Sequence, residues 1–250
     1  MSAFLRRLLS TPVIARLPIR VRSGIAKGAR WSLFPWTAYW RGTHEPAVQA
    51  RLLQMGDWTG KHVWDLGSHY GIFTIGLGRL VGPTGSVAAF EPNPLSYERL
   101  QLHVRLNHLG WVKTFPCAAS DSTGSQRFFI YEGLETTSSH LAFEGETWNE
   151  TIPTIQVNSR RLDDMVAAGE INLPDFIKLD VEGHGHKALV GAMAALAKSR
   201  PTLLIGLHSV PEVEGILAVL EPLGYRSTPI LPDAPPVPTS GFDYLFEPLP

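Results

Sequence analysis

Cysteine is nearly absent from this 250-residue sequence, and Cys117 is the single one. The chain therefore forms no internal disulfide and offers no cysteine cluster for a metal ion. It also lacks an apolar run of 18 residues, so we expect no membrane-spanning helix. Arg and Pro interrupt the apolar segments near the N-terminus every few residues, which argues against a secretory signal and favours a cytoplasmic protein.

Acidic residues are missing before Glu45, although eight of the 22 Lys and Arg residues lie there. The rest of the chain holds 14 basic and 23 acidic residues, so it is acidic. This asymmetry predicts a basic N-terminal extension over residues 1–45 and a globular domain over residues 46–250. A domain of that size can bury a sizeable core.

The extension has two interpretations. Its apolar and basic residues recur at roughly helical spacing, as in helices that pack on a domain or lie on an anionic membrane surface. We favour packing, because Pro12 and Pro18 cut the helices short, and peripheral membrane contact is the alternative. A nucleic-acid arm is disfavoured by the acidic remainder. Aromatic residues that could line a pocket or join the core follow, namely Trp31, Phe34, Trp36, Tyr39 and Trp40.

The most informative stretch begins with a short apolar strand, residues 62–66, that carries Asp65. Gly67 and Gly71 come next, and a helical pattern follows over residues 72–80. Gly67 permits a sharp turn and a close ligand, and the unpaired N–H groups of the helix start point at the same place. The order D-x-G-x-x-x-G differs from the dinucleotide fingerprint G-x-G-x-x-G, which the sequence lacks. A carboxylate at this point favours a ligand with an amino group and no pyrophosphate, such as S-adenosylmethionine.

A second acid follows the next predicted strand. The strand over residues 86–90 is apolar from Val87 onward, and Glu91 comes directly after it, followed by Pro92 and Asn93. Open α/β sheets bind ligands at the carboxyl ends of parallel strands, so Glu91 is placed to hold the two ribose hydroxyls. The two acids, separated by a helix, predict the cofactor site together.

A third strand, residues 112–118, is expected to bring Ser120 and Asp121 to the same edge, near the adenine amino group. Asp121 could instead cap a turn with Gly124. The residues expected to bind the cofactor are Asp65, Gly67, Ser68, Tyr70, Gly71, Thr74, Glu91, Pro92, Asn93, Ser120 and Asp121.

Acids and histidines gather after two later strands. Asp180, Glu182 and His184 lie at or beyond the end of a buried strand near residues 176–181, and His208 ends another. An alcohol acceptor must lose its proton, and a positioned base contributes roughly 10²–10⁴-fold to that step. His208 and Glu182 are the leading candidates for the base, followed by Asp180 and His184, although each histidine could simply complete a structural hydrogen bond.

A metal ion is a further alternative at this place. Asp180, Glu182 and His208 could hold a divalent cation that acidifies the hydroxyl. Nothing in their spacing demands a metal, so we do not favour one. We expect Lys178 to pair with a neighbouring acid.

Strands and helices alternate from residue 60 onward, which predicts a doubly wound α/β sheet of seven strands. The polar stretch over residues 133–151 is too long for an ordinary connection and is a candidate substrate lid. The remaining strands are expected at residues 126–131, 154–157, 201–207, 225–230 and 242–246. The remaining helices are expected at residues 95–109, 161–168, 187–197 and 211–220.

Several motifs together resemble the FkbM family of methyltransferases. They are residues 63–67 (VWDLG), 89–93 (AFEPN), 119–121 (ASD), 161–164 (RLDD) and 177–183 (IKLDVEG), in the order of the family. The resemblance covers about residues 60–208 and does not include the basic extension. It implies a class I methyltransferase fold of Rossmann-like type, S-adenosylmethionine as donor, and O-methylation of a small molecule or sugar. His69 and Tyr70 stand where the family commonly has smaller or varied residues.

Two other functions compete with this one. A nicotinamide-dependent oxidoreductase could use the same sheet, but the missing G-x-G-x-x-G argues against it. A membrane-associated protein could bind the cofactor without catalysis, but the intact Asp65, Gly67, Gly71 and Glu91 argue against that.

Overall fold

The computed structural model describes residues 18–32, 39–129, 140–141 and 153–250. Its centre is a seven-stranded sheet, as expected, in which the middle strands run parallel and one strand near the edge runs antiparallel to its neighbours. In spatial order the strands are β12 (Tyr225–Pro229), β13 (Phe242–Pro248), β11 (Thr202–Leu207), β10 (Phe176–Leu179), β3 (His62–Leu66), β4 (Ser86–Phe90) and β5 (Val112–Phe115).

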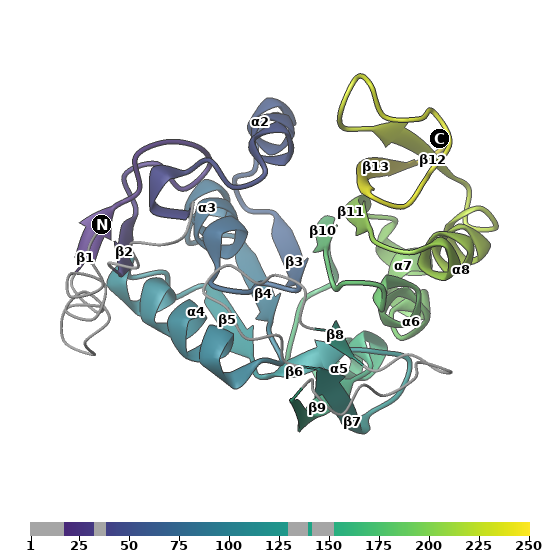
Figure 1. Ribbon diagram of the computed structural model, residues 1–250, viewed down its shortest axis with the longest axis horizontal. Helices are drawn as coiled ribbons and strands as arrows, with labels where there is room; N and C mark the ends of the chain where they lie inside the picture. The colour runs from purple at the N-terminus through teal and green to yellow at the C-terminus, as the bar shows by residue number, and fades with distance from the viewer. Residues whose placement is uncertain (1–17, 33–38, 130–139, 142–152) are drawn as a thin grey trace.

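Helices cover both faces of this sheet (Figure 1), because its strands are apolar on both sides. In β3, Trp64 and Leu66 join one buried cluster and Val63 joins the other. The first face packs against α5 (Leu162–Ala167), α6 (Gly185–Val190), α7 (Met193–Ser199) and α8 (Val210–Leu220). The second packs against α2 (Pro46–Gln54), α3 (Ile72–Val81) and α4 (Pro94–Leu106).

The predicted third strand is two strands in two sheets. β5 ends at Phe115, and β6 (Cys117–Ala119) pairs instead with β9 (Thr154–Arg160) in a four-stranded sheet. That sheet also contains β7 (Gly124–Phe129) and β8 (His140–Leu141). Pro116 stands at the break, and its nitrogen cannot donate to a strand neighbour. Residues 119–121 therefore leave the main sheet rather than extend it.

The predicted helix over residues 187–197 is also divided, into α6 and α7. Asp163 at the start of α5 accepts hydrogen bonds from the backbone N–H groups of Ala194 and Ala195, at 3.0 and 2.9 Å. These bonds supply an N-terminal cap to α7 from a distant part of the chain. The helical spacing of the sequence did not reveal this cap.

The described part of the N-terminal extension forms a two-stranded ribbon, β1 (Pro18–Arg20) and β2 (Arg30–Ser32), followed by the short 3₁₀ helix η2 (Tyr39–Arg41). The short helices were expected in the segments before Pro18, so this ribbon does not test them. The ribbon packs on α4, where the Trp31 ring stacks on His103 with 3.6 Å between the ring centres. Residues 1–17 and most of the predicted lid lie outside the described residues. None of the helices in the described ranges has the length and apolar character that a bilayer span requires.

Candidate active site

A cavity of roughly 840 Å³, counted out to its open mouth, lies at the carboxyl ends of β3, β4 and β10. An open α/β sheet is expected to bind its ligand at this edge. Of the residues predicted from the sequence, eight line the cavity: Gly67, Ser68, Glu91, Pro92, Asn93, Asp180, Glu182 and His184. The structure thus brings the ends of β3 and β4 and residues 180–184 after β10 to one place.

Gly67 forms the tight turn at the end of β3. Its backbone has φ of +86°, and a Cβ at this position would overlap the carbonyl oxygen of Asp180. The turn is fixed on its other side, because the N–H groups of Gly67 and Ser68 donate to the carbonyl oxygen of Phe90 at 3.1 and 2.9 Å. A residue without a side chain is therefore required for the loops after β3 and β10 to meet.

Glu91 is 5% exposed, and both carboxylate oxygens accept backbone hydrogen bonds. The N–H of His69 donates to one oxygen at 2.7 Å and the N–H of Asn93 to the other at 2.8 Å. Burial raises the pKa of Glu91 to about 7, against these two hydrogen bonds, which lower it. Each oxygen can accept one further hydrogen bond, so the carboxylate can receive two hydroxyls from a ligand.

Asp65 is buried and does not line the cavity. One carboxylate oxygen accepts a hydrogen bond from the Thr74 hydroxyl, and the other has no hydrogen-bond partner among the described residues. Lys178 lies opposite Asp65 in the register of β10 and β3. Burial raises the pKa of Asp65, although the charge of Lys178 opposes this shift.

The other predicted cofactor residues lie around the cavity without lining it. Gly71 adopts a positive φ of 90° and begins α3, and Tyr70 stacks on the ring of His69 at 3.9 Å. The Ser120 hydroxyl donates to Asp121 at 3.1 Å. These two residues come directly after β6, whose residues Cys117, Ala118 and Ala119 line the cavity, but Ser120 and Asp121 themselves do not.

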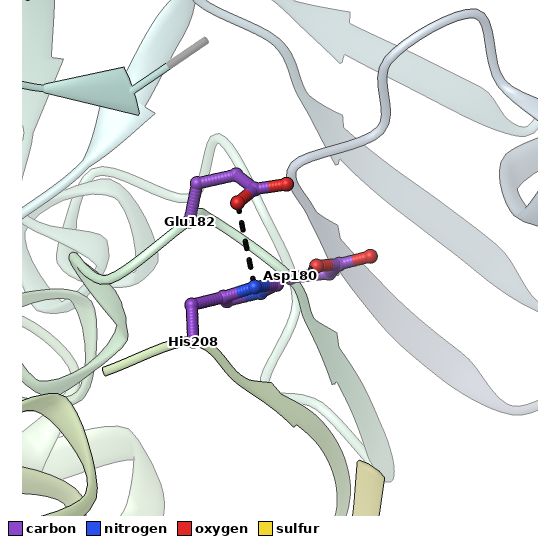
Figure 2. Close-up of side chains that lie close together, drawn as sticks. All are labelled: Asp180, Glu182 and His208. Carbon is purple, nitrogen blue, oxygen red and sulfur yellow. Dashed lines mark hydrogen bonds and ion pairs between the residues drawn. The ribbon is translucent and has the colours of Figure 1, made fainter. Parts of the chain in front are cut away.

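Asp180 links Lys178 to His208. Its two oxygens lie 2.9 Å from Lys178 Nζ and 2.9 Å from His208 Nε2, so the expected pairing of Lys178 with an acid is confirmed. Burial favours the neutral carboxyl, but the Lys178 charge and the bond to His208 hold the pKa of Asp180 well below its usual range. The other nitrogen of His208, Nδ1, lies 3.4 Å from Glu182 (Figure 2). Burial lowers the pKa of His208, but the carboxylates outweigh it and raise the value to about 9.

His184 is 2% exposed and lies on the cavity wall. Its Nε2 is 3.1 Å from the Ser120 hydroxyl, and its Nδ1 has no hydrogen-bond partner among the described residues. Burial lowers the pKa of His184 to about 4, so the ring is neutral at physiological pH. His208 is exposed and does not line the cavity.

Tyr39 and His44 also line the cavity, and they come from the N-terminal part of the chain. The Tyr39 hydroxyl is 2.7 Å from His69 Nδ1, and burial raises the pKa of Tyr39 above its usual range. The aromatic cluster of the extension was the only sequence signal for Tyr39, and it fitted core packing equally well. No spacing rule singled out His44.

Comparisons with known proteins identify the family and the fold. The sequence model of the methyltransferase FkbM domain matches residues 65–227. The hexuronic acid methyltransferase AglP of Haloferax volcanii is 25% identical over 165 residues, which are 63% of this chain and 60% of that protein. The chain thus spans less than two thirds of the length of this curated relative.

Two solved structures share the fold. A methyltransferase FkbM from Methylobacillus flagellatus superposes with a TM-score of 0.52 and 19% identity over 78% of this chain and 45% of that one. Fibrillarin from Aeropyrum pernix, solved with bound S-adenosylmethionine, superposes with a TM-score of 0.51 and 12% identity. The superposition covers 95% of this chain and 84% of that one. The class I methyltransferase fold expected from the sequence is confirmed.

Proposed function

Because this chain belongs to the FkbM family of methyltransferases and is thus an S-adenosylmethionine-dependent methyltransferase, we propose that it methylates a hydroxyl of a sugar or another small molecule. The observation that carries the proposal is the cavity between Glu91 and the Asp180–Glu182 loop. The side that contains Glu91 suits a nucleoside, and the side that contains Asp180 and Glu182 suits removal of a proton from the acceptor. The hexuronic acid methyltransferase among the relatives supports a sugar as acceptor.

Glu91 and the Gly67 turn fit the donor. Glu91 is held in place by two backbone N–H groups and keeps capacity for two ribose hydroxyls. Gly67 and Ser68 present a backbone edge with little side chain, which permits close approach. Asp65 stands behind this turn and acts on the donor through Lys178 and the start of α3. Ser120 and Asp121 have the corresponding indirect role, through His184.

Asp180, Glu182 and His184 fit the acceptor side. In the transfer, the acceptor oxygen bonds to the methyl carbon while the carbon–sulfur bond breaks and its electron pair stays on sulfur. The hydroxyl proton passes to Glu182 or His184, which line this side of the cavity. His208 holds Asp180 and Glu182 in place from behind. The main contributions of the protein are alignment and exclusion of water.

The test is turnover by the purified full-length chain with radiolabelled S-adenosylmethionine and a panel of hexoses and hexuronic acids. We expect label in a sugar product whose NMR spectrum shows an O-methyl group. Methylation at carbon or nitrogen would contradict the O-transfer. Donor binding without turnover on any acceptor would favour a non-catalytic cofactor-binding protein.

We also propose that residues 1–45 form an extension to a catalytic domain over residues 46–250. Tyr39 and His44 of the extension line the cavity, so the extension contributes to the choice of acceptor. The alternative role of the extension is peripheral contact of its basic residues with an anionic membrane. Flotation of the full chain with anionic liposomes tests this, and a chain that stays with the protein fraction contradicts it.

A further inference from the structure

Three side chains with metal-binding atoms meet behind the acceptor wall. Asp180 and Glu182 follow β10, His208 follows β11, and one ligand atom from each lies within 4.8 Å of the others (Figure 2). The two carboxylates also line the cavity. Residues from two neighbouring strand ends are thus gathered around one point at the proposed active site.

His208 has a carboxylate at each ring nitrogen. Nε2 lies 2.9 Å from Asp180 and Nδ1 lies 3.4 Å from Glu182. A neutral imidazole has one N–H and cannot donate to both carboxylates. The arrangement therefore needs a positive charge between the ring and the carboxylates. That charge is either a second proton on the ring or a metal cation that the ring and the carboxylates share.

Gly206 leaves space at this point. A Cβ at Gly206 would lie 3.2 Å from Asp180 Oδ1, 3.2 Å from Asp243 Oδ1 and 3.4 Å from His208 Nε2. Asp243 stands opposite Gly206 in the pairing of β11 with β13. Oxygen and nitrogen atoms from three strands or strand ends thus converge around a position that the glycine keeps free of a side chain.

We propose that Asp180, Glu182 and His208 form a binding site for a divalent cation of the Mn²⁺ or Mg²⁺ class. Carboxylate oxygens suit Mg²⁺ and Mn²⁺, and the imidazole shifts the preference toward Mn²⁺. Lys178 occupies Asp180 Oδ2, so Asp180 Oδ1 is the ligand atom. Asp243 stands close enough to bind through water. His208 is exposed, Asp180 and Glu182 are half-buried, and the two carboxylates line the cavity, so a cation held here would be reachable from the cavity.

The role of the cation rests on the proposed O-methyltransfer. A cation held by these three side chains would polarise an acceptor hydroxyl and lower its pKa, as metals do for bound water. The oxygen would then take the methyl group as the carbon–sulfur bond breaks toward sulfur, and its proton would pass to Nδ1 of His184, which lines the cavity and has no hydrogen-bond partner among the described residues. With the cation in place, Glu182 and His208 are ligands rather than bases.

The test is a titration of the EDTA-treated full-length chain with Mn²⁺, in which free Mn²⁺ is followed by electron paramagnetic resonance. We expect a single site, weakened roughly tenfold or more by Glu182→Gln and by His208→Gln. Glu214→Gln, which alters an exposed acid on α8, is the matched control and should bind as the unaltered chain does. Absence of Mn²⁺ binding, or equal binding in all four proteins, overturns the proposal.

A second measurement needs no variant. Anomalous diffraction from crystals of the unaltered chain soaked in Mn²⁺ should place a peak between the three side chains, and a peak elsewhere overturns the site. Binding of S-adenosylhomocysteine is measured in the same samples. Binding of S-adenosylhomocysteine without binding of Mn²⁺ would overturn the cation site and leave the methyltransferase proposal intact. Binding of Mn²⁺ without binding of S-adenosylhomocysteine would overturn the proposed donor site.

Discussion

Gly67 at the end of β3 lies directly against the carbonyl oxygen of Asp180 after β10, with no room for a Cβ between them. This contact fixes the turn on the donor side of the cavity relative to the acids on the acceptor side. The φ of +86° at Gly67 adds a conformational cost for any other residue.

Gly67→Ala should therefore lower the free energy of unfolding by about 2 kcal/mol or more and weaken binding of S-adenosylhomocysteine. Urea unfolding and calorimetry measure the two effects. Gly110→Ala is the matched control, because a Cβ there meets nothing within 4 Å and the change should be nearly neutral. Equal stability of the two variants would contradict the close contact.

Asp65→Ala should reduce the affinity for S-adenosylhomocysteine by roughly tenfold or more. The side chain does not reach the cavity, but its loss leaves the Thr74 hydroxyl without its acceptor and reduces the compensation of Lys178. Thr74→Val is the control, because it removes the hydrogen bond and keeps the carboxylate. Calorimetry measures the affinity of each variant. Normal affinity in a folded Asp65→Ala chain would exclude Asp65 from the cofactor site.

Glu91 should make donor binding depend on pH. Its pKa of about 7 means that the carboxyl is protonated below neutrality, where it loses acceptor capacity for ribose hydroxyls. Affinity for S-adenosylhomocysteine should then fall by up to about tenfold per pH unit below pH 7. Glu91→Gln should bind weakly at every pH with a flat profile, whereas Glu214→Gln should keep the profile of the unaltered chain.

The same carboxyl should affect stability in the opposite sense. Its folded pKa is raised from 4.5 to about 7, so its contribution to stability is present below pH 4.5 and is lost as pH rises through 7. The loss is at most about 3 kcal/mol. Urea unfolding across this range should show a steeper decline in the unaltered chain than in Glu91→Gln, and parallel declines would show that burial does not shift this group.

His208→Asn should lower kcat by roughly 10²-fold while the affinity for S-adenosylhomocysteine changes little. His208 contacts Asp180 and Glu182 and lies away from the donor side. His108→Asn alters an exposed histidine and should leave kcat unchanged. Steady-state kinetics decide, and a normal kcat in His208→Asn would exclude His208 from the acceptor side.

The parallel strands were the most predictable part of the fold. The bounds of β3 and β4 agree with the expectation from the sequence, because each is a short apolar run with an acid at or next to its end and with Gly67 or Pro92 following, which leaves little ambiguity. The divided third strand and the divided helix after β10 were not predicted. Their causes are a missing donor at Pro116 and a cap from Asp163, which act at single positions and do not alter the periodicity.

The candidate site was predictable where it depends on strand ends and less so elsewhere. Glu91 and Asp180 line the cavity because each follows a parallel strand of the main sheet. Asp121 follows β6, which belongs to another sheet, and it does not line the cavity. Tyr39 and His44 arrive from outside the matched family domain, and only tertiary packing places them there.

The most direct test of the central claim is a crystal structure of the chain with S-adenosylhomocysteine. We expect the nucleoside between the Gly67 turn and Glu91, with the ribose hydroxyls on the Glu91 carboxylate and the sulfur facing Asp180 and Glu182. A ligand bound at any other place, or a ribose that makes no contact with Glu91, would contradict it.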